Sequence, residues 1–407
     1  MRRVSAGTQG FALVVVLTLL AVLVLVTYAI SLVGRVDTQV GITATYQVKA
    51  RQSALAGLRI ALANLQVAAG GDVVTGTSSV RGVTVNNRFL LGIWSPTSTS
   101  AAPQNWYVSG NLESDGPNRI THTSIPSAAT AITLVGEKTV TANSDMARAY
   151  RVSLGNEGYA FWIGDEGSKA SLGFDQTEVP ASGAGRALMT NPSGEIASFN
   201  GSNRAKIHTW EQIQLCAPGA SLKSRYHAYT ANAFWNIGAG ALQGGLFNVN
   251  TTESDAWAAV LRAYDAARSP SEPELTDNLA GELAATLVGN FAQRTGSAKV
   301  RLGPFRSVVG FWDSHIVQDS LDESGITTVT QDDIRNVIDP MLAVRSDTFR
   351  IRAYGDAMNP ADGGDIGAIP EAVAYCEAIV QRTDQDLPGY GKKFVITYFR
   401  WLGPDDI

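Results

Sequence analysis

The stretch FALVVVLTLLAVLVLVTYAISLV, residues 11–33, decides the fold of this 407-residue chain. It carries no charged side chain. As an α-helix rising ~1.5 Å per residue it extends ~35 Å, which is enough to cross a hydrocarbon core of ~30 Å with some tilt. No later stretch of the sequence is both as long and as free of charge. The sequence therefore predicts a single membrane-spanning helix near the N-terminus.

The charges that flank this stretch predict its orientation. Arg2 and Arg3 precede it with no acid among the first ten residues, whereas Arg35 after it is offset by Asp37. Because positive charge tends to stay on the cytoplasmic side, the N-terminus is expected in the cytoplasm and the rest of the chain outside.

Three interpretations of the segment remain open. A cleaved secretory signal shares the basic start, but its apolar core is usually about 7–15 residues long, and Thr27-Tyr28-Ala29 matches a cleavage site poorly. A signal anchor fits the pattern without any cleavage. The third interpretation depends on the boundary itself, where Gly10 immediately precedes Phe11, the residue that opens the apolar run.

That boundary, QGFAL at residues 9–13, resembles the leader junction of type IV prepilins and type II secretion pseudopilins. In that family a prepilin peptidase cleaves after the glycine and methylates the new first residue, so the resemblance implies processing between Gly10 and Phe11. Most members carry glutamate at the fifth mature position, which is Val15 here. The K-type minor pseudopilin, the tip subunit of type II secretion, also lacks it. A carboxylate with no subunit ahead to pair with would be costly in hydrocarbon.

The segment after the apolar run has the pattern of an amphipathic helix. It contains no proline from residue 35 to residue 69, and Gly70-Gly71 supplies a stop signal. Its apolar residues recur at helical spacing, and they are Val36, Val40, Val48, Leu55, Leu58, Leu62 and Leu65. We therefore predict one helix from Phe11 to Ala69, roughly 90 Å long at ~1.5 Å per residue. Bends are expected at Gly34, Gly41 and Gly57.

Beyond residue 71 the sequence alternates between strand-like and helix-like segments. Strands are predicted at residues 88–94, 104–108, 131–140, 148–154, 159–163, 348–354, 372–382 and 393–402. Helices are predicted at 256–267, at 272–294 with Pro273 in the first turn, and at 330–337 behind an acidic cap. The expected fold is α+β and pilin-like: a long N-terminal helix packed on an antiparallel β-rich head, with an inserted helical module.

Several later motifs extend the resemblance to the K-type minor pseudopilin. They are YAFWIGDEGSKASL at 159–172, FNVNTT at 247–252, PFRSV at 304–308, SDTFRIRAYG at 346–355 and AYCEAIVQR at 374–382. The exact residues of these motifs, together with GFALV at the start and FRWL near the end, resemble still more closely the family called Verru_Chthon cassette protein A. That family is defined by a cassette of pilin-like proteins, so the resemblance implies a place in an envelope assembly.

Pattern and resemblance together divide the chain into six parts. We predict a leader at 1–10, a transmembrane helix at 11–33, its extension at 34–70, a β-rich head at 71–247, a helical insertion at 248–345, and C-terminal strands at 346–407 that complete the head. The helix positions expected to contact sister helices are Phe11, Val15, Leu19, Leu23 and Tyr28.

The resemblance implies a minor pseudopilin-like subunit that initiates or caps a filament of the type IV pilus or type II secretion kind. Its expected partners are the prepilin peptidase, other pilin-like cassette subunits and the bacterial inner membrane, with the C-terminal part in the periplasm. The alternative is a signal-anchored periplasmic domain that binds a ligand or a wall polymer and never assembles.

The sequence predicts no enzyme. The four histidines form no metal-binding pair, and no nucleophile elbow is present. Asp165 and Glu166 could be imagined as an acid pair for glycosidic chemistry, but we expect an ion pair between this turn and Lys169 instead. Nucleic acid is not expected as the main partner, because the net charge is -5 and no basic block occurs.

Two further features are left with alternatives. Cys216 and Cys376 either pair in an oxidising compartment or remain separate buried thiols. A loop spanning Asp356, Asn359, Asp362 and Asp365 offers hard oxygen ligands of the kind that suit calcium, which the related tip subunits bind. The alternative for that loop is a set of solvated acids. No other cofactor is expected.

Overall fold

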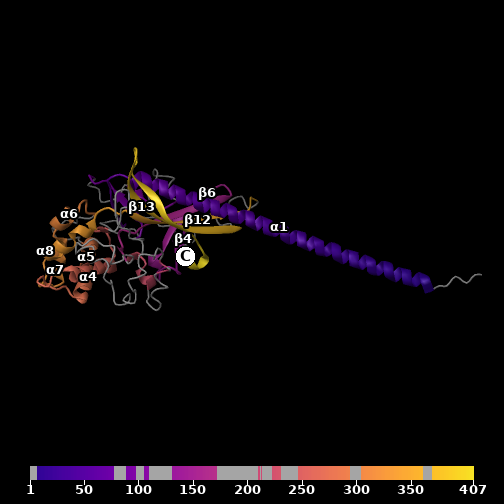
Figure 1. Ribbon diagram of the computed structural model, residues 1–407, viewed down its shortest axis with the longest axis horizontal. Coiled ribbons are helices and arrows are strands. Elements are labelled where there is room, and N and C mark those ends of the chain that lie inside the picture. Colours follow the sequence, from indigo (N-terminus) through magenta and orange to yellow (C-terminus); the bar gives the residue numbers. More distant parts are fainter. Residues whose placement is uncertain are drawn as a thin grey trace, which may run out of the picture.

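A computed structural model describes residues 7–77, 89–97, 105–109, 131–171, 210, 212, 222–230, 246–293, 304–360 and 369–407. Its longest element is helix α1, Gly7–Ala69, which extends far out of the head (Figure 1). The predicted helix is confirmed over its whole length. It runs as one continuous helix through Gly34, Gly41 and Gly57, and the bends expected at these glycines remain a prediction.

A five-stranded sheet forms the centre of the head, in the order β14-β13-β12-β7-β6. These strands are β6 Val152–Leu154, β7 Glu157–Asp165, β12 Thr348–Ala357, β13 Ala372–Leu387 and β14 Gly391–Leu402. Every neighbouring pair is antiparallel. The C-terminal strands therefore complete a sheet begun some two hundred residues earlier, and the predicted α+β fold is confirmed.

Shorter strands surround this sheet. They are β1 Val74–Thr77, β2 Leu91–Trp94 and β3 Asn105–Trp106 in one sheet, β4 Ala131–Val135 with β5 Ala147–Tyr150, β8 Ala170–Ser171 with β9 Tyr229–Thr230, and β10 Phe247–Asn248 with β11 Leu342–Ala343. The predicted strand at 148–154 is divided into β5 and β6 at Arg151, whose side chain pairs with Asp356.

The described residues between β10 and β11 form five α-helices. They are α4 Ser254–Ala267, α5 Asp277–Gln293, α6 Val308–Asp313, α7 Ile316–Glu323 and α8 Gln331–Ile338. The predicted acidic cap of α8 is confirmed as a capping box between Thr330 and Asp333. The prediction that Pro273 lies in the first turn of a helix was wrong. This proline precedes α5, and its carbonyl accepts a hydrogen bond from the Tyr264 hydroxyl of α4.

The two ends of this helical segment meet, because β10 and β11 pair in parallel. Asn248 fixes the junction: its amide nitrogen donates to the backbone and hydroxyl oxygens of Thr75 and to the hydroxyl of Ser346. The helices pack around aromatic rings, with the Trp257 ring stacked on Phe311 at 5.6 Å. The exact domain boundaries remain a prediction.

Alternation along β12 divides the head into two cores. Phe349, Ile351 and Ala353 face α1 and pack with its buried side chains. The opposite face of the sheet meets the core that continues into the helical segment, which includes Trp162 and Tyr354. Arg350 and Arg352 lie on this second face, where they are buried. One face of the sheet thus holds α1, and the opposite face holds the buried arginines. These are the two features of the candidate site.

Candidate functional site

The first half of α1 is an exposed apolar rod. Every described side chain from residue 13 to residue 45 is exposed, and Phe11 is 74% exposed. Among the described residues, α1 is the one helix whose length and apolar composition would allow it to cross a membrane. Such a surface is unstable in water, so it requires lipid or other apolar helices around it.

The structure places all the predicted processing and assembly positions on this rod. Gly10 and Phe11 lie within the helical backbone near its start. The side chains expected to meet sister helices are all exposed, namely Phe11, Val15, Leu19, Leu23 and Tyr28. Their exposure is compatible with the predicted contacts, and their roles remain predictions.

The second half of α1 packs on the sheet through small residues. Ala50, Ala54 and Ala61 are fully buried against it. At Gly355 of β12 the two backbones approach so closely that a Cβ atom would overlap backbone atoms of Ala50 and Ala54. The glycine is needed here for contact rather than for conformation. This close seam holds the rod in a fixed direction relative to the head.

The C-terminal end of α1 is tied to the β13–β14 hairpin. The Arg382 guanidinium donates to the carbonyl oxygen of Ala69, the last helical residue, and to that of Gly71 just beyond the helix. Gln66 donates to the backbone of Lys392 and accepts from the backbone N–H of Phe394. The predicted helix stop at Gly70-Gly71 is confirmed, and this hairpin supports it.

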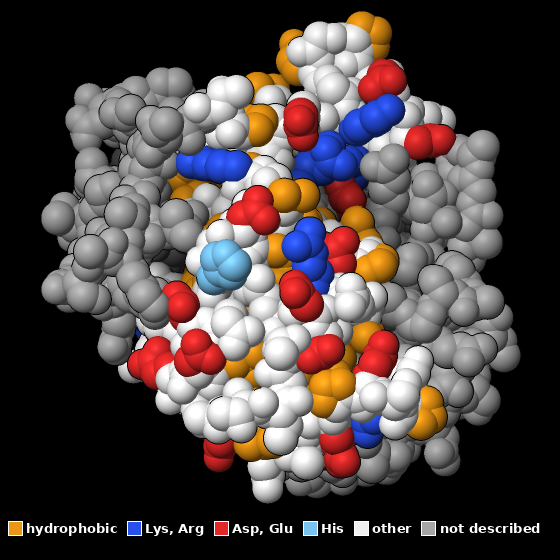
Figure 2. Space-filling view, turned by 90° about the vertical axis from the view of Figure 1, so that its left-hand side faces the viewer, with side chains coloured by type: hydrophobic (Ala, Val, Ile, Leu, Met, Phe, Trp, Pro, Cys, Tyr) orange, Lys and Arg blue, Asp and Glu red, His pale blue; other side chains and the backbone are white. Residues whose placement is uncertain are grey.

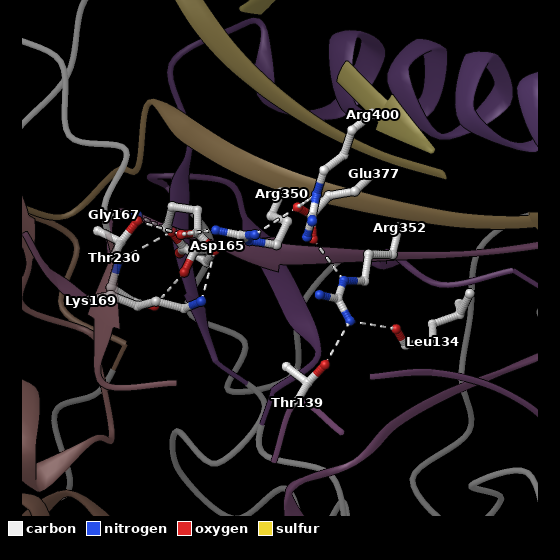
Figure 3. Close-up of polar contacts among 12 residues, drawn as sticks. Leu134, Thr139, Asp165, Gly167, Lys169, Thr230, Arg350, Arg352, Glu377 and Arg400 are labelled. Atoms are coloured by element: carbon white, nitrogen blue, oxygen red, sulfur yellow. Dashed lines mark hydrogen bonds and ion pairs between the residues drawn. The ribbon is translucent and has the colours of Figure 1, made fainter. Parts of the chain in front are cut away.

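Beneath the sheet, on the side away from α1, lies a buried charge network (Figure 3). Glu166 accepts from the Lys169 ammonium at 2.7 Å, from Arg350 Nε at 3.1 Å, and from the Thr230 hydroxyl. Burial raises the pKa of Glu166, but the attraction of Arg350 and Lys169 outweighs it and lowers that pKa to about 2. The predicted ion pair between this turn and Lys169 is confirmed.

A second buried carboxylate completes the network. Glu377 of β13 pairs with Arg350 Nη1 at 3.0 Å, Arg352 Nε at 2.8 Å and Arg400 Nε at 3.1 Å. Its burial opposes ionisation, but the three guanidinium groups lower its pKa well below the usual range. Arg350 thus bridges both carboxylates, and it joins the turn after β7 to strands β12 and β13.

Asp165 differs from its neighbour Glu166. Burial raises the pKa of Asp165 to about 7, although its Oδ1 accepts from the backbone N–H groups of Gly167 and Ser168. Both acids are buried, and their described partners are groups of this chain. The pair therefore has the surroundings of a structural turn rather than those of an acid pair open to a substrate.

The arginines and Glu377 in this network were not singled out from the sequence. The signal was present in TFRIRAY at 348–354, where two arginines alternate with apolar residues in a predicted inner strand. Charges at such positions must be paired when buried. The sequence does not predict which carboxylates pair with these arginines, because the register of β12 against β7 and β13 cannot be deduced from the local sequence.

Cys376 and Asp356, one from the cysteine pair and one from the candidate calcium loop, are both buried. Cys376 is a free thiol in the seam beneath α1, and burial raises its pKa to about 12. Cys216 lies outside the described residues. Both carboxylate oxygens of Asp356 accept from Arg151, at 2.6 and 2.8 Å, so this acid is engaged by a cation of the chain itself.

The candidate calcium loop is described only in part. Asp362 and Asp365 lie outside the described residues. Within the part of the chain that the structure describes, no group of three or more His, Cys, Asp or Glu side chains is placed to hold a metal ion.

The chain resembles known proteins in structure rather than in sequence. No known protein family and no curated protein matches the chain. Among solved structures, it resembles a chain of the GspK-GspI-GspJ complex from the type 2 secretion system of enterotoxigenic Escherichia coli. The two are 12% identical, with a TM-score of 0.30 over 62% of this chain and 82% of the other.

Proposed function

We propose that this protein is a membrane-anchored, minor pseudopilin-like subunit that initiates or caps a filament of the type IV pilus or type II secretion kind. The observation that carries the proposal is α1, a single helix of 63 residues. Its first half is apolar and exposed, and its second half is fixed to an antiparallel sheet through a close seam. A helix of this kind can stay in the inner membrane before assembly and enter a filament without refolding.

The exposed half supplies the assembly contacts in this proposal. Cleavage between Gly10 and Phe11 by the prepilin peptidase leaves Phe11 as a methylated first residue. Side chains along the rod then replace lipid contacts by contacts with sister helices of companion pilin-like subunits. Val15 brings no carboxylate to the fifth mature position, which suits a subunit at the leading end. The periplasmic head contributes no catalysis.

The experiment that tests this proposal is the intact mass and N-terminal sequence of protein extracted from native membranes. A chain that begins at methylated Phe11 supports it. A chain that begins at Met1 leaves a plain anchored domain, and one that begins near Ile30 indicates ordinary signal cleavage. Gly10→Val should leave the leader in place, whereas the matched control Gly7→Val should be processed normally.

A second test addresses assembly directly. Deletion of the gene should abolish the filament while the companion subunits remain in the membrane. Re-expression of the intact chain should restore it, and re-expression of Gly10→Val should not. A normal filament in the deletion strain would overturn the proposal.

A further inference from the structure

A strip of large apolar side chains is exposed on β14, the outermost strand of the five-stranded sheet. Ile396, Phe399 and Trp401 are 44%, 39% and 37% exposed. Their register partners on β13 are Val380, Ala378 and Cys376, which all belong to the core beneath α1. The strip therefore lies on the α1 side of the sheet, where the sheet continues past the helix.

Helix α1 forms the second wall of this strip. The Arg51 guanidinium lies over the Trp401 ring at 5.4 Å, and Gln66 binds the start of β14. Leu55 and Leu62 share the helical face of Arg51 and Gln66 by their spacing, and both are partly buried. Helix and edge strand thus form a corner with apolar side chains on both walls.

The apolar line continues down the helix toward the membrane. At 100° per residue, Val33, Val40 and Val48 fall within an arc of about 80° that also holds Leu55 and Leu62. The three valines are exposed. A helix packed against the proposed assembly surface of α1 would therefore meet the corner as it leaves the membrane.

The charges at the corner indicate the chemistry of the occupant. Between residues 38 and 69, α1 contains Lys49, Arg51 and Arg59 and no acid. Lys49 pairs with Glu157 on the β7 side, whereas Arg51 and Arg59 are exposed on the face that meets β14. On β14, Arg400 pairs with Glu377 on the other side of the sheet and Lys392 pairs with Asp386, so the positive charge at the corner comes from Arg51 and Arg59. A complementary partner presents carboxylates to this corner.

A lipid surface is not the occupant that this geometry favours. Arg51 follows Val33, the end of the apolar run, by a helical distance of ~27 Å at ~1.5 Å per residue. The corner therefore lies well above the hydrocarbon when α1 spans the bilayer. A protein partner that rises beside α1 reaches it without tilting the head.

We propose that the corner between α1 and β14, formed by Arg51, Leu55, Leu62, Ile396, Phe399 and Trp401, docks an acidic amphipathic helix of the companion subunit that follows this one in the filament. The inference rests on the proposed function and adds to it the face of the head that the next subunit covers. Apolar side chains of the companion helix fill the corner, and its carboxylates pair with Arg51 and Arg59.

The test is photo-crosslinking in the native cell with p-benzoylphenylalanine at three single positions. Phe399 probes the corner, Val40 probes the exposed rod, and Leu154 on β6 is the control at the opposite edge of the sheet. We expect Phe399 and Val40 to give adducts with the same pilin-like companion, identified by peptide mass, and Leu154 to give none. Arg51→Glu should reduce the Phe399 adduct about tenfold, a loss of about 1.4 kcal/mol, whereas Lys223→Glu should not.

Each of the other outcomes contradicts a specific part of the proposal. An adduct from Val40 without one from Phe399 overturns the docking corner and leaves the proposed function standing. Adducts from neither position overturn both. An adduct at Phe399 with a second copy of this chain, or with lipid, overturns the companion as occupant. An Arg51→Glu variant that keeps the full Phe399 adduct overturns the charge pairing.

Discussion

Arg350 joins the two buried carboxylates in the interior of the head. Its guanidinium bridges Glu166 and Glu377, and its side chain is 2% exposed. Together with Lys169 and Arg352 it also surrounds the Tyr226 ring, with the Lys169 ammonium 4.6 Å from the ring centre. Compared with well-packed apolar residues of similar volume, a buried network of this kind adds little to stability. Removal of one partner is nevertheless strongly destabilising, because it leaves a buried charge unpaired.

Arg350→Leu should therefore lower the free energy of unfolding by about 3–5 kcal/mol. Arg262→Leu is the matched control, because Arg262 pairs at 3.8 Å with Asp277, whose side chain is 85% exposed. That surface pair should cost no more than about 1 kcal/mol. Urea unfolding of the full chain in detergent measures both, and equal losses would show that the network is not a structural centre.

Asp165 should make stability depend on pH in the opposite sense to an ordinary paired carboxylate. Its folded pKa is raised from 3.8 to about 7, so the folded state holds a proton that the unfolded state has released. The associated stability is complete below pH ~4 and is lost as the pH rises toward ~7. Asp165→Asn keeps a neutral acceptor for Gly167 and Ser168. It should therefore stabilise the protein relative to wild type more at pH 8 than at pH 5.

Unfolding midpoints at these two pH values measure the difference. Ser153→Ala, an exchange of an exposed residue that does not titrate, serves as the control and should change the midpoint equally at both pH values. Glu166 works in the other direction: its pKa is lowered from 4.5 to about 2, so its contribution is lost only as the solution becomes strongly acidic. A flat difference for Asp165→Asn between pH 5 and pH 8 would contradict the assignment.

At the scale of elements, the seam between α1 and β12 is the contact that tolerates least change. Gly355→Ala places a Cβ against the backbone of Ala50 and Ala54. Neither α1 nor β12 can shift to make room without breaking its own backbone hydrogen bonds. We expect a loss of about 3 kcal/mol or more. The same substitution at Gly289 in α5, where a Cβ meets nothing within 4 Å, should stabilise by about 0.5–1 kcal/mol. Thermal unfolding distinguishes the two, and similar effects would refute the close seam.

The elements also show what the sequence could predict. Period-2 patterns and the long apolar run identified α1 and the main strands correctly, because burial on a fixed face leaves a repeat that can be read locally. Helices α6 and α7 were missed because they are only six and eight residues long and were not recognised by a cap motif, whereas the equally short α8 was predicted from its acidic cap. The site was only half predicted: Glu166 and Lys169 are three residues apart, whereas Arg350 reaches Glu166 across 184 positions.

At the scale of the whole molecule, charge is unevenly distributed. Residues 248–345 hold 14 acidic and 8 basic residues, so this segment accounts for the net negative charge of the chain. It forms the end of the head opposite the free end of α1 (Figure 1). Figure 2 views that end, where carboxylates are spread over the described surface. The α1–β14 corner is basic by contrast, so the two regions are suited to different neighbours.

Removal of residues 1–34 should leave the head folded and make it soluble as a monomer. Described side chains from residue 13 to residue 45 are exposed, so the head loses no buried contact with this part of α1. Its melting temperature by circular dichroism should therefore match that of the full chain. A truncation at residue 58 removes part of the seam and should yield an unfolded or aggregated product. A large loss of stability in the first truncation would show that the rod supports the head.

The seam between α1 and the sheet has a mechanical consequence for assembly. The helix lies along the sheet from Ala50 to Ala69, and its far end is held by Arg382 and Gln66. Tension applied at Phe11 along the helix axis acts parallel to this interface, so all its contacts bear the load together and none opens first. Under the proposed function, the head would therefore leave a bilayer together with its helix as one rigid body.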